Sequence, residues 1–169
     1  MGNQDLYEEL LQSLEGLVKV YRSVLRVVRQ EKEILISADL DELNENNRAK
    51  ERMLHEVKKR EEERLAIVQR ILQQEGLPPE KNRLLDLATH FGGERGERLR
   101  NYHSVLELLV KRVKKLNLQN ESLVQAALHR ITGAMEALRD TLKEKNTYQK
   151  KGGMAQAPTA SGHFVSREA

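Results

Sequence analysis

The stretch from Leu99 to Leu142, LRNYHSVLELLVKRVKKLNLQNESLVQAALHRITGAMEALRDTL, decides the fold of this chain. Residues at alternating steps of three and four form one line: Leu99, Tyr102, Leu106, Leu109, Val113, Leu116, Asn120, Leu123 and Ala127. After one extra four-residue step, the line resumes as Ile131, Ala134, Leu138 and Thr141. Such spacing keeps a narrow apolar line on a helix of about 50 residues and is typical of a coiled-coil seam. The extra step is a stutter, which locally unwinds a supercoil.

The composition favours a thin core. Of 169 residues, 38% are hydrophobic, 33% are charged and only 4% are aromatic, which is typical of a narrow helical bundle. The absence of Cys excludes disulfides and thiolate metal sites. The longest uninterrupted apolar run is the four residues 65–68, far short of a membrane span. The acidic start of the chain does not resemble a secretory signal, so we expect a soluble intracellular protein without direct membrane insertion.

Three long helices and one short helix are expected, packed as an elongated antiparallel all-α bundle over residues 1–148. Their predicted ranges are 5–36, 39–75, 79–90 and 94–148, followed by a flexible tail over 149–169. Asp39 and Glu42 form a capping-box pattern at the start of the second helix, although a kinked continuous helix is an alternative there. The second helix has the weaker seam, because Asn47, Lys50 and Glu61 fall at core-like positions.

Helix lengths predict an uncovered surface. At helical rise, the first two helices span about 50 and 55 Å, whereas the last spans about 75–80 Å. Short connections make neighbouring helices antiparallel, so the last helix should run about 25 Å past the turn between the first two. We expect apolar side chains of residues 131–148 to lie uncovered there, where another protein can bind them.

No catalytic or cofactor constellation is visible, so we expect a protein that is not an enzyme and binds no metal or cofactor. The His residues lack the Glu-x-x-His and His-Glu-x-x-His spacings of metal sites. The glycine-rich segment 92–96 lacks the Gly-Lys-Ser/Thr ending of a phosphate loop. The cluster Lys111, Arg112, Lys114 and Lys115 has no interleaved aromatic residues, which favours a solvated helix face over a nucleic-acid site.

The segment Leu116-Asn117-Leu118-Gln119-Asn120-Glu121-Ser122-Leu123 resembles the Leu-Asn-x-x-Asn-x-x-Leu signature of the FlgN family, the flagellar type III export chaperones. The segment 39–54 is similar to the family's Asp-x-x-x-Leu element with a downstream Lys. Thr147-Tyr148 followed by Gly152 is similar to the start of the family's tail. Asn117 and Asn120 are the family-motif residues, and a buried Asn in a seam can also simply fix helix register.

The resemblance implies a cytoplasmic chaperone that binds hook-filament junction (hook-associated) proteins. It also implies that the C-terminal helix and tail hold the client, which is then delivered to the export-gate membrane protein. The predicted client-binding residues are Leu123, Ala127, Ile131, Ala134, Met135, Leu138 and Leu142, and Tyr148 is the predicted export-gate contact. The alternative is a homodimeric coiled-coil scaffold without a client, in which the same seam pairs two copies.

Overall fold

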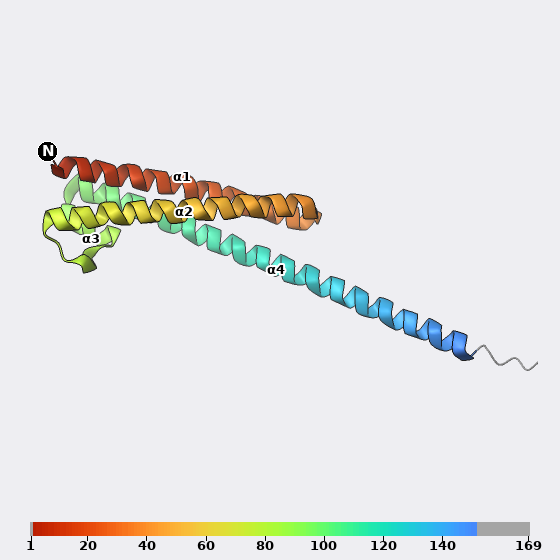
Figure 1. The fold of residues 1–169 in the computed structure, drawn as a ribbon. Helices are drawn as coiled ribbons and strands as arrows, with labels where there is room; N and C mark the ends of the chain where they lie inside the picture. Colours follow the sequence, from red (N-terminus) through yellow and green to blue (C-terminus); the bar gives the residue numbers. More distant parts are fainter. Residues whose placement is uncertain (1, 152–169) are drawn as a thin grey trace, which may run out of the picture. The chain divides into compact units, whose positions relative to one another are not determined.

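The computed structural model describes the backbone of residues 2–151 and the side chains of residues 5–144. Within them the chain is helical (Figure 1). The elements are α1 (Gly2–Ser37), α2 (Leu40–Glu75), the 3-10 turn η1 (Pro79–Lys81), α3 (Leu84–Phe91) and α4 (Gly93–Lys151). The prediction of three long helices and one short helix in a bundle is confirmed. The chain divides into a first unit, residues 1–125, and a second unit, residues 126–169.

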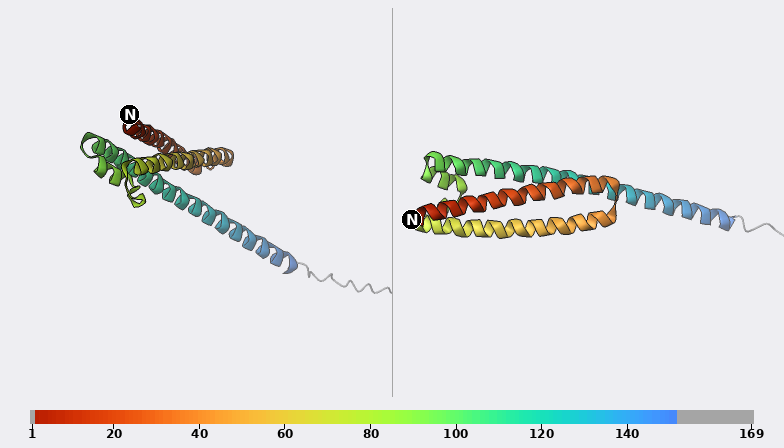
Figure 2. Two further views of the ribbon diagram at one scale, coloured as in Figure 1. Left: turned by 60° about the vertical axis from the view of Figure 1, so that its left-hand side comes forward. Right: turned by 90° about the horizontal axis from the view of Figure 1, so that it is seen from above.

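A tight turn joins α1 and α2, so the alternative of a kinked continuous helix is excluded. Ala38 adopts a left-handed conformation with φ of 58°, and Asp39 is extended with φ of −82°. The Asp39 Oδ1 atom accepts a hydrogen bond from the Glu42 backbone N–H at 2.9 Å, which satisfies one free donor of the first turn of α2. The two helices therefore run antiparallel and side by side (Figures 1 and 2).

The core of the first unit is built around α1, which is buried on two sides. One cluster joins α1 to α2, α3 and the start of α4, and it contains Leu10, Leu14, Val68, Leu87 and Leu99. A second cluster joins α1 to α4 further along and contains Val18, Val24, Leu25, Val28, Leu109 and Val113. Seen from above, α1 accordingly runs between α2 and the first part of α4 (Figure 2).

In contrast, α2 buries few side chains. Its buried apolar residues are confined to the last turns: Ile67, Val68, Ile71 and Leu72. Asn46 is buried and Asn47 is exposed, so the polar position in the seam lies one residue earlier than we expected. Leu54 and Leu65 of the same helix are exposed as well. The polar residues along the middle of α2 explain this thin coverage, because charged groups resist full burial.

The connection from α2 to α4 contains two short elements, whereas a single short helix was expected over 79–90. Gly76 ends α2 in a left-handed conformation with φ of 63°, and η1 and α3 follow as separate elements. Gly96 does not lie in a loop, because α4 already begins at Gly93. A Cβ atom on Gly96 would lie 2.3 Å from the Ala88 carbonyl oxygen, so α3 and α4 approach each other closely there.

Tyr7 of α1 contacts the start of α4. Its hydroxyl donates a hydrogen bond to the Arg95 carbonyl oxygen at 2.9 Å, and the Arg95 guanidinium lies 5.0 Å from the centre of the Tyr7 ring. Burial raises the pKa of Tyr7, which keeps the phenol protonated as a donor. The Phe91 ring packs edge-on against Tyr7 at 5.2 Å between centroids. These contacts position the first turns of α4 within the first unit.

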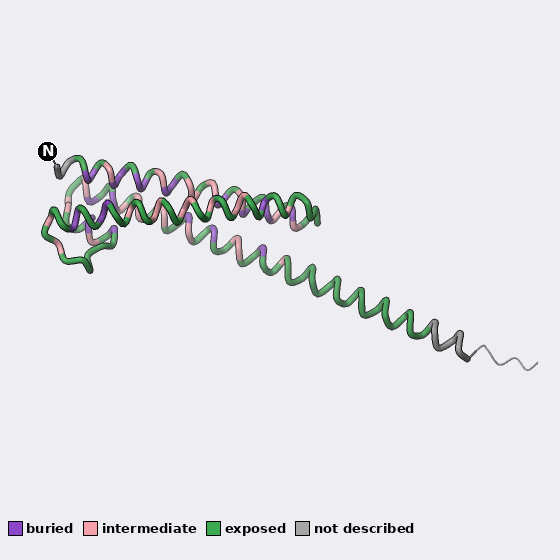
Figure 3. The backbone as a smooth tube through the Cα atoms, in the orientation of Figure 1, coloured by how far each residue is buried: buried purple, intermediate pink, exposed green. Residues whose placement is uncertain are grey.

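The second unit contains the remaining part of α4. Every side chain from Ala126 to Glu144 is exposed, and the tube in Figure 3 is uniformly green over this part. The flexible tail that the sequence predicts over 149–169 overlaps the last three residues of α4, and 152–169 lie outside the described residues. Among the described helices, none is both long and apolar enough to cross a membrane.

Candidate functional site

A continuous apolar surface lies on α4 in the second unit. It consists of Leu128, Ile131, Met135, Leu138 and Leu142, which are 53%, 57%, 68%, 61% and 53% exposed. We call this set the exposed stripe. Its members recur at steps of three and four, so they share one side of the helix. Five large apolar side chains that are each more than half exposed form a patch of the kind that marks an interaction site.

The exposed stripe contains Ile131, Met135, Leu138 and Leu142 from the predicted client-binding set. Two further predicted residues, Ala127 and Ala134, are exposed along one edge of it. Leu123, the remaining predicted residue, is half-buried and belongs to the first unit.

Leu128 belongs to the exposed stripe but not to the predicted client-binding set. It lies three residues before Ile131, so the spacing could have found it. The line that we followed instead passed through the small side chain of Ala127.

The rest of this helix surface is polar, so the segment is amphipathic. Glu136 and Asp140 lie on the side opposite the exposed stripe, and Arg139 lies along one of its edges. The hydroxyls of Thr132 and Thr141 donate to backbone carbonyls one turn earlier in the same helix, at 3.0 and 2.9 Å. The surface is thus suited to pack against one apolar partner while its back remains in water.

Asn120 of the family motif lies inside the first unit rather than on a surface. It is 3% exposed, and its Nδ2 donates to the Val28 carbonyl oxygen at 3.0 Å and to Glu31 Oε2 at 2.9 Å. Lys50 Nζ donates to the same Glu31 oxygen at 2.8 Å. We call Asn120, Glu31 and Lys50 the polar node. It connects α1, α2 and α4, so the motif acts on the packing of the bundle.

Some buried polar atoms in and outside the polar node form no hydrogen bond. Asn120 Oδ1 is buried without a hydrogen-bond partner, as are Asn117 Oδ1 and Asn46 Nδ2. Each unpaired buried polar atom costs about 1–3 kcal/mol, which offsets much of the gain from the bonds that are made. A buried polar contact of this kind sets the register of one helix on another more than it adds stability. The interpretation of Asn120 as a residue that fixes register therefore fits its contacts.

The sequence also led to expectations about an export-gate contact and about metal binding. The side chain of Tyr148, the predicted export-gate contact, lies outside the described side chains, although its backbone belongs to α4. Across side chains 5–144, no group of three or more His, Cys, Asp or Glu residues is arranged to hold a metal ion.

Comparison with known proteins identifies a family. The family model described as FlgN protein matches residues 1–156. Comparison with curated proteins and with solved structures found no match. The family match includes the whole bundle, the polar node and the exposed stripe. Because it covers nearly the entire chain, this protein belongs to the FlgN family of non-enzymatic flagellar export chaperones for hook-associated proteins.

Proposed function

We propose that this chain acts in the cytoplasm, where the exposed stripe holds an amphipathic segment of a hook-associated protein until delivery to the flagellar type III export gate. The observation that carries the proposal is the solvent exposure of five large apolar side chains on one side of α4. A chaperone needs such a surface free in the absence of its client. The family to which the chain belongs supplies the class of client.

The mechanism that we propose is packing of one amphipathic helix against another. Burying each Leu, Ile or Met side chain contributes about 1.5–3 kcal/mol. Four or five such anchors are sufficient for affinity in the micromolar range after the cost of association is subtracted. We further propose that residues from 149 onward add contacts to the client.

The test replaces the centre of the exposed stripe by charge. We expect Ile131→Asp together with Leu138→Asp to abolish co-purification with hook-associated proteins, because two carboxylates cannot be buried against an apolar partner without charge compensation. The matched control is Ala126→Asp with Ala137→Asp, which adds the same charges to exposed positions on the opposite side of the helix. The control should retain its clients, and both variants should keep the circular dichroism of the bundle.

If the Ile131→Asp, Leu138→Asp protein still co-purifies with its clients, the client site lies elsewhere on the chain. The scaffold alternative makes a different prediction, because the spacing of the exposed stripe also suits a coiled-coil pair. A client-free dimer that persists at nanomolar concentration in light scattering, and that the same double substitution dissociates, would favour the scaffold over the chaperone.

We propose a separate role for Tyr148 in contact with the export gate. The Tyr148→Ala variant should bind hook-associated proteins with unchanged affinity but deliver them more slowly. Secretion of these proteins into the culture medium measures delivery, and isothermal titration with the purified client measures binding. Normal secretion by Tyr148→Ala cells would remove the residue from the delivery step.

A further inference from the structure

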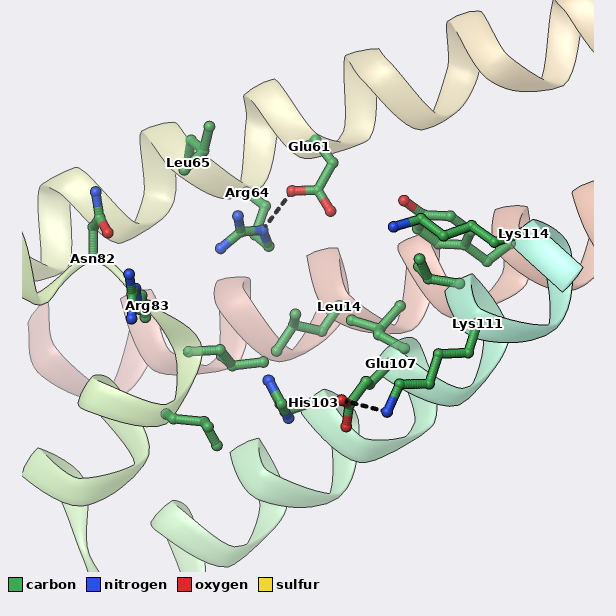
Figure 4. Close-up of a pocket in the computed structure, with 15 residues that line it drawn as sticks. Leu14, Glu61, Arg64, Leu65, Asn82, Arg83, His103, Glu107, Lys111 and Lys114 are labelled. Atoms are coloured by element: carbon green, nitrogen blue, oxygen red, sulfur yellow. Dashed lines mark hydrogen bonds and ion pairs between the residues drawn. The ribbon is translucent and has the colours of Figure 1, made fainter.

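A second apolar surface lies in the first unit and is separate from the exposed stripe. An open groove of about 690 Å³ runs between α2 and α4, with α1 as its floor and the start of α3 at one end. Figure 4 shows Glu61 and Arg64 of α2 across the opening from Glu107 and Lys111 of α4, with Leu14 of α1 between them. The residues of α4 that line it extend from His103 to Lys114, or about 16 Å at helical rise.

The groove exists because α3 is too short to fill the space between α2 and α4. A helix of eight residues covers the apolar floor at one end only, where Leu84 and Leu87 are buried. Leu65 of α2 and Leu85 of α3 also line the groove, and they remain 40% and 44% exposed. The length of the opening along α4 corresponds to about three turns of one further helix.

The rim of the groove carries an excess of positive charge. Arg64 pairs with Glu61 at 2.8 Å, and Lys111 pairs with Glu107 at 2.8 Å. The hydrogen bond from Lys111 lowers the pKa of Glu107, so this pair stays ionised and nearly neutral in sum.

Two further cations of the rim are uncompensated. Arg83, the residue before α3, and Lys114 of α4 line the groove and form no ion pair with any described side chain. They lie towards opposite ends of it (Figure 4). An incoming anionic group would therefore find a positive partner at either end.

We propose that this groove docks an amphipathic helix of another protein, one that bears Glu or Asp residues along the edges of its apolar face. The apolar floor and walls would take the Leu-type side chains, and Arg83 and Lys114 would meet the carboxylates. The exposed stripe of a second copy fits less well, because its edges bear Arg139 and small residues while its acids lie on the opposite side. Charge complementarity thus favours a partner other than the chain itself.

The test uses two fluorescein-labelled peptides of about 15 residues on the full-length chain. Both carry Leu at steps of three and four, and they differ only in bearing Glu or Lys at the edges of the apolar face. Fluorescence anisotropy at physiological salt should give an affinity about tenfold higher for the Glu peptide than for the Lys peptide. The Ile131→Asp, Leu138→Asp protein should bind the Glu peptide equally well, because the groove and the exposed stripe share no residue.

Charge reversal locates the binding. The variant Arg83→Glu with Lys114→Glu should invert the preference between the two peptides. The matched control, Arg112→Glu with Lys115→Glu, changes two exposed cations of the same net charge that do not line the groove. It should leave the preference intact, and both variants should retain the circular dichroism and melting temperature of the parent.

Several outcomes would overturn the proposal. They are absence of binding by the Glu peptide, equal affinity for both peptides, and an equal loss in the two charge-reversed variants. Loss of binding on Ile131→Asp with Leu138→Asp would assign the peptide to the exposed stripe instead. A peptide-free dimer that Arg83→Glu with Lys114→Glu dissociates would make a second copy the occupant.

Discussion

Asn120 illustrates how one polar side chain can matter more for alignment than for stability. Its hydrogen bond to the Glu31 carboxylate at 2.9 Å is charge-assisted, and such bonds contribute about 1.5–3 kcal/mol. Its unpaired Oδ1 cancels a comparable amount. The main effect of the hydrogen bond is therefore on helix register, because only one axial position of α4 relative to α1 places the Asn120 amide next to Glu31. Lys50 then neutralises the carboxylate from α2.

The polar node predicts the effect of an isosteric change. Asn120→Asp should lower the free energy of unfolding by about 2–4 kcal/mol at pH 7, because it replaces a donor to Glu31 by a second buried carboxylate. Repulsion between the two carboxylates raises the pKa of the new carboxyl in the folded state. The deficit should therefore be largest at neutral pH and shrink as the pH falls towards 4, where that carboxyl is protonated.

Urea denaturation at a series of pH values measures this dependence. The control is Asn101→Asp, the same change at an exposed position of α4. A loss of stability that is equal for the two variants, or independent of pH, would contradict the role assigned to the polar node.

At the scale of the helices, sequence periodicity predicted which segments are helical but only part of what they bury. In α1, Leu10, Leu14 and Val28 recur at helical spacing along one face, and all three are buried. The buried face is wider than that line and also includes Tyr7, Leu11 and Leu25. The extra width follows from α1 packing against both α2 and α4, which a search for one narrow line cannot reveal.

The exposed stripe and the groove differ in how far sequence could predict them. The predicted uncovered segment contains Ile131, Met135, Leu138 and Leu142, because exposure there depends on periodicity and helix length. In contrast, the groove depends on where α3 ends between α2 and α4. No local pattern encodes that placement, since its walls come from helices far apart in sequence.

Two glycines of α4 should respond oppositely to the same substitution. Gly96→Ala places a Cβ atom 2.3 Å from the Ala88 carbonyl oxygen, so α3 and α4 must separate. We expect a loss of about 1–3 kcal/mol in the free energy of unfolding. Gly133→Ala meets no atom within 4 Å and should stabilise its part of the helix by about 0.5–1 kcal/mol.

Thermal denaturation followed by circular dichroism measures both glycine variants. Gly96→Ala should lower the midpoint, whereas Gly133→Ala should raise the helical signal at low temperature. An unchanged midpoint for Gly96→Ala would mean that α3 adjusts freely, and the close packing of α3 on α4 would then contribute little to stability.

The two units differ in whether their apolar side chains are buried or exposed. The first unit buries them around α1, whereas the second unit leaves the exposed stripe in water. Helices without packed apolar faces are marginal in isolation, because most helical stability in proteins comes from tertiary packing. The helical state of residues 126–144 therefore rests mainly on local backbone hydrogen bonds.

This division predicts a gradient of hydrogen exchange along α4. Amides of residues 126–144 should exchange at least about a hundredfold faster than those near Leu109 and Val113, which belong to the packed core. Addition of a purified hook-associated protein should slow exchange in 126–144 selectively. Hydrogen exchange with mass spectrometry checks both statements, and uniform protection along α4 in the free protein would contradict the first.

The tight turn at Ala38 and Asp39 also bears on the order in which the bundle assembles on the ribosome. The α1–α2 hairpin needs only local contacts, whereas the bond from Asn120 to Val28 joins residues 92 positions apart. At bacterial elongation rates that interval lasts on the order of ten seconds. During this interval, the apolar side of α1 that α4 later covers is exposed to solvent in the nascent polypeptide. We therefore expect ribosome-associated holdase chaperones to bind α1 there.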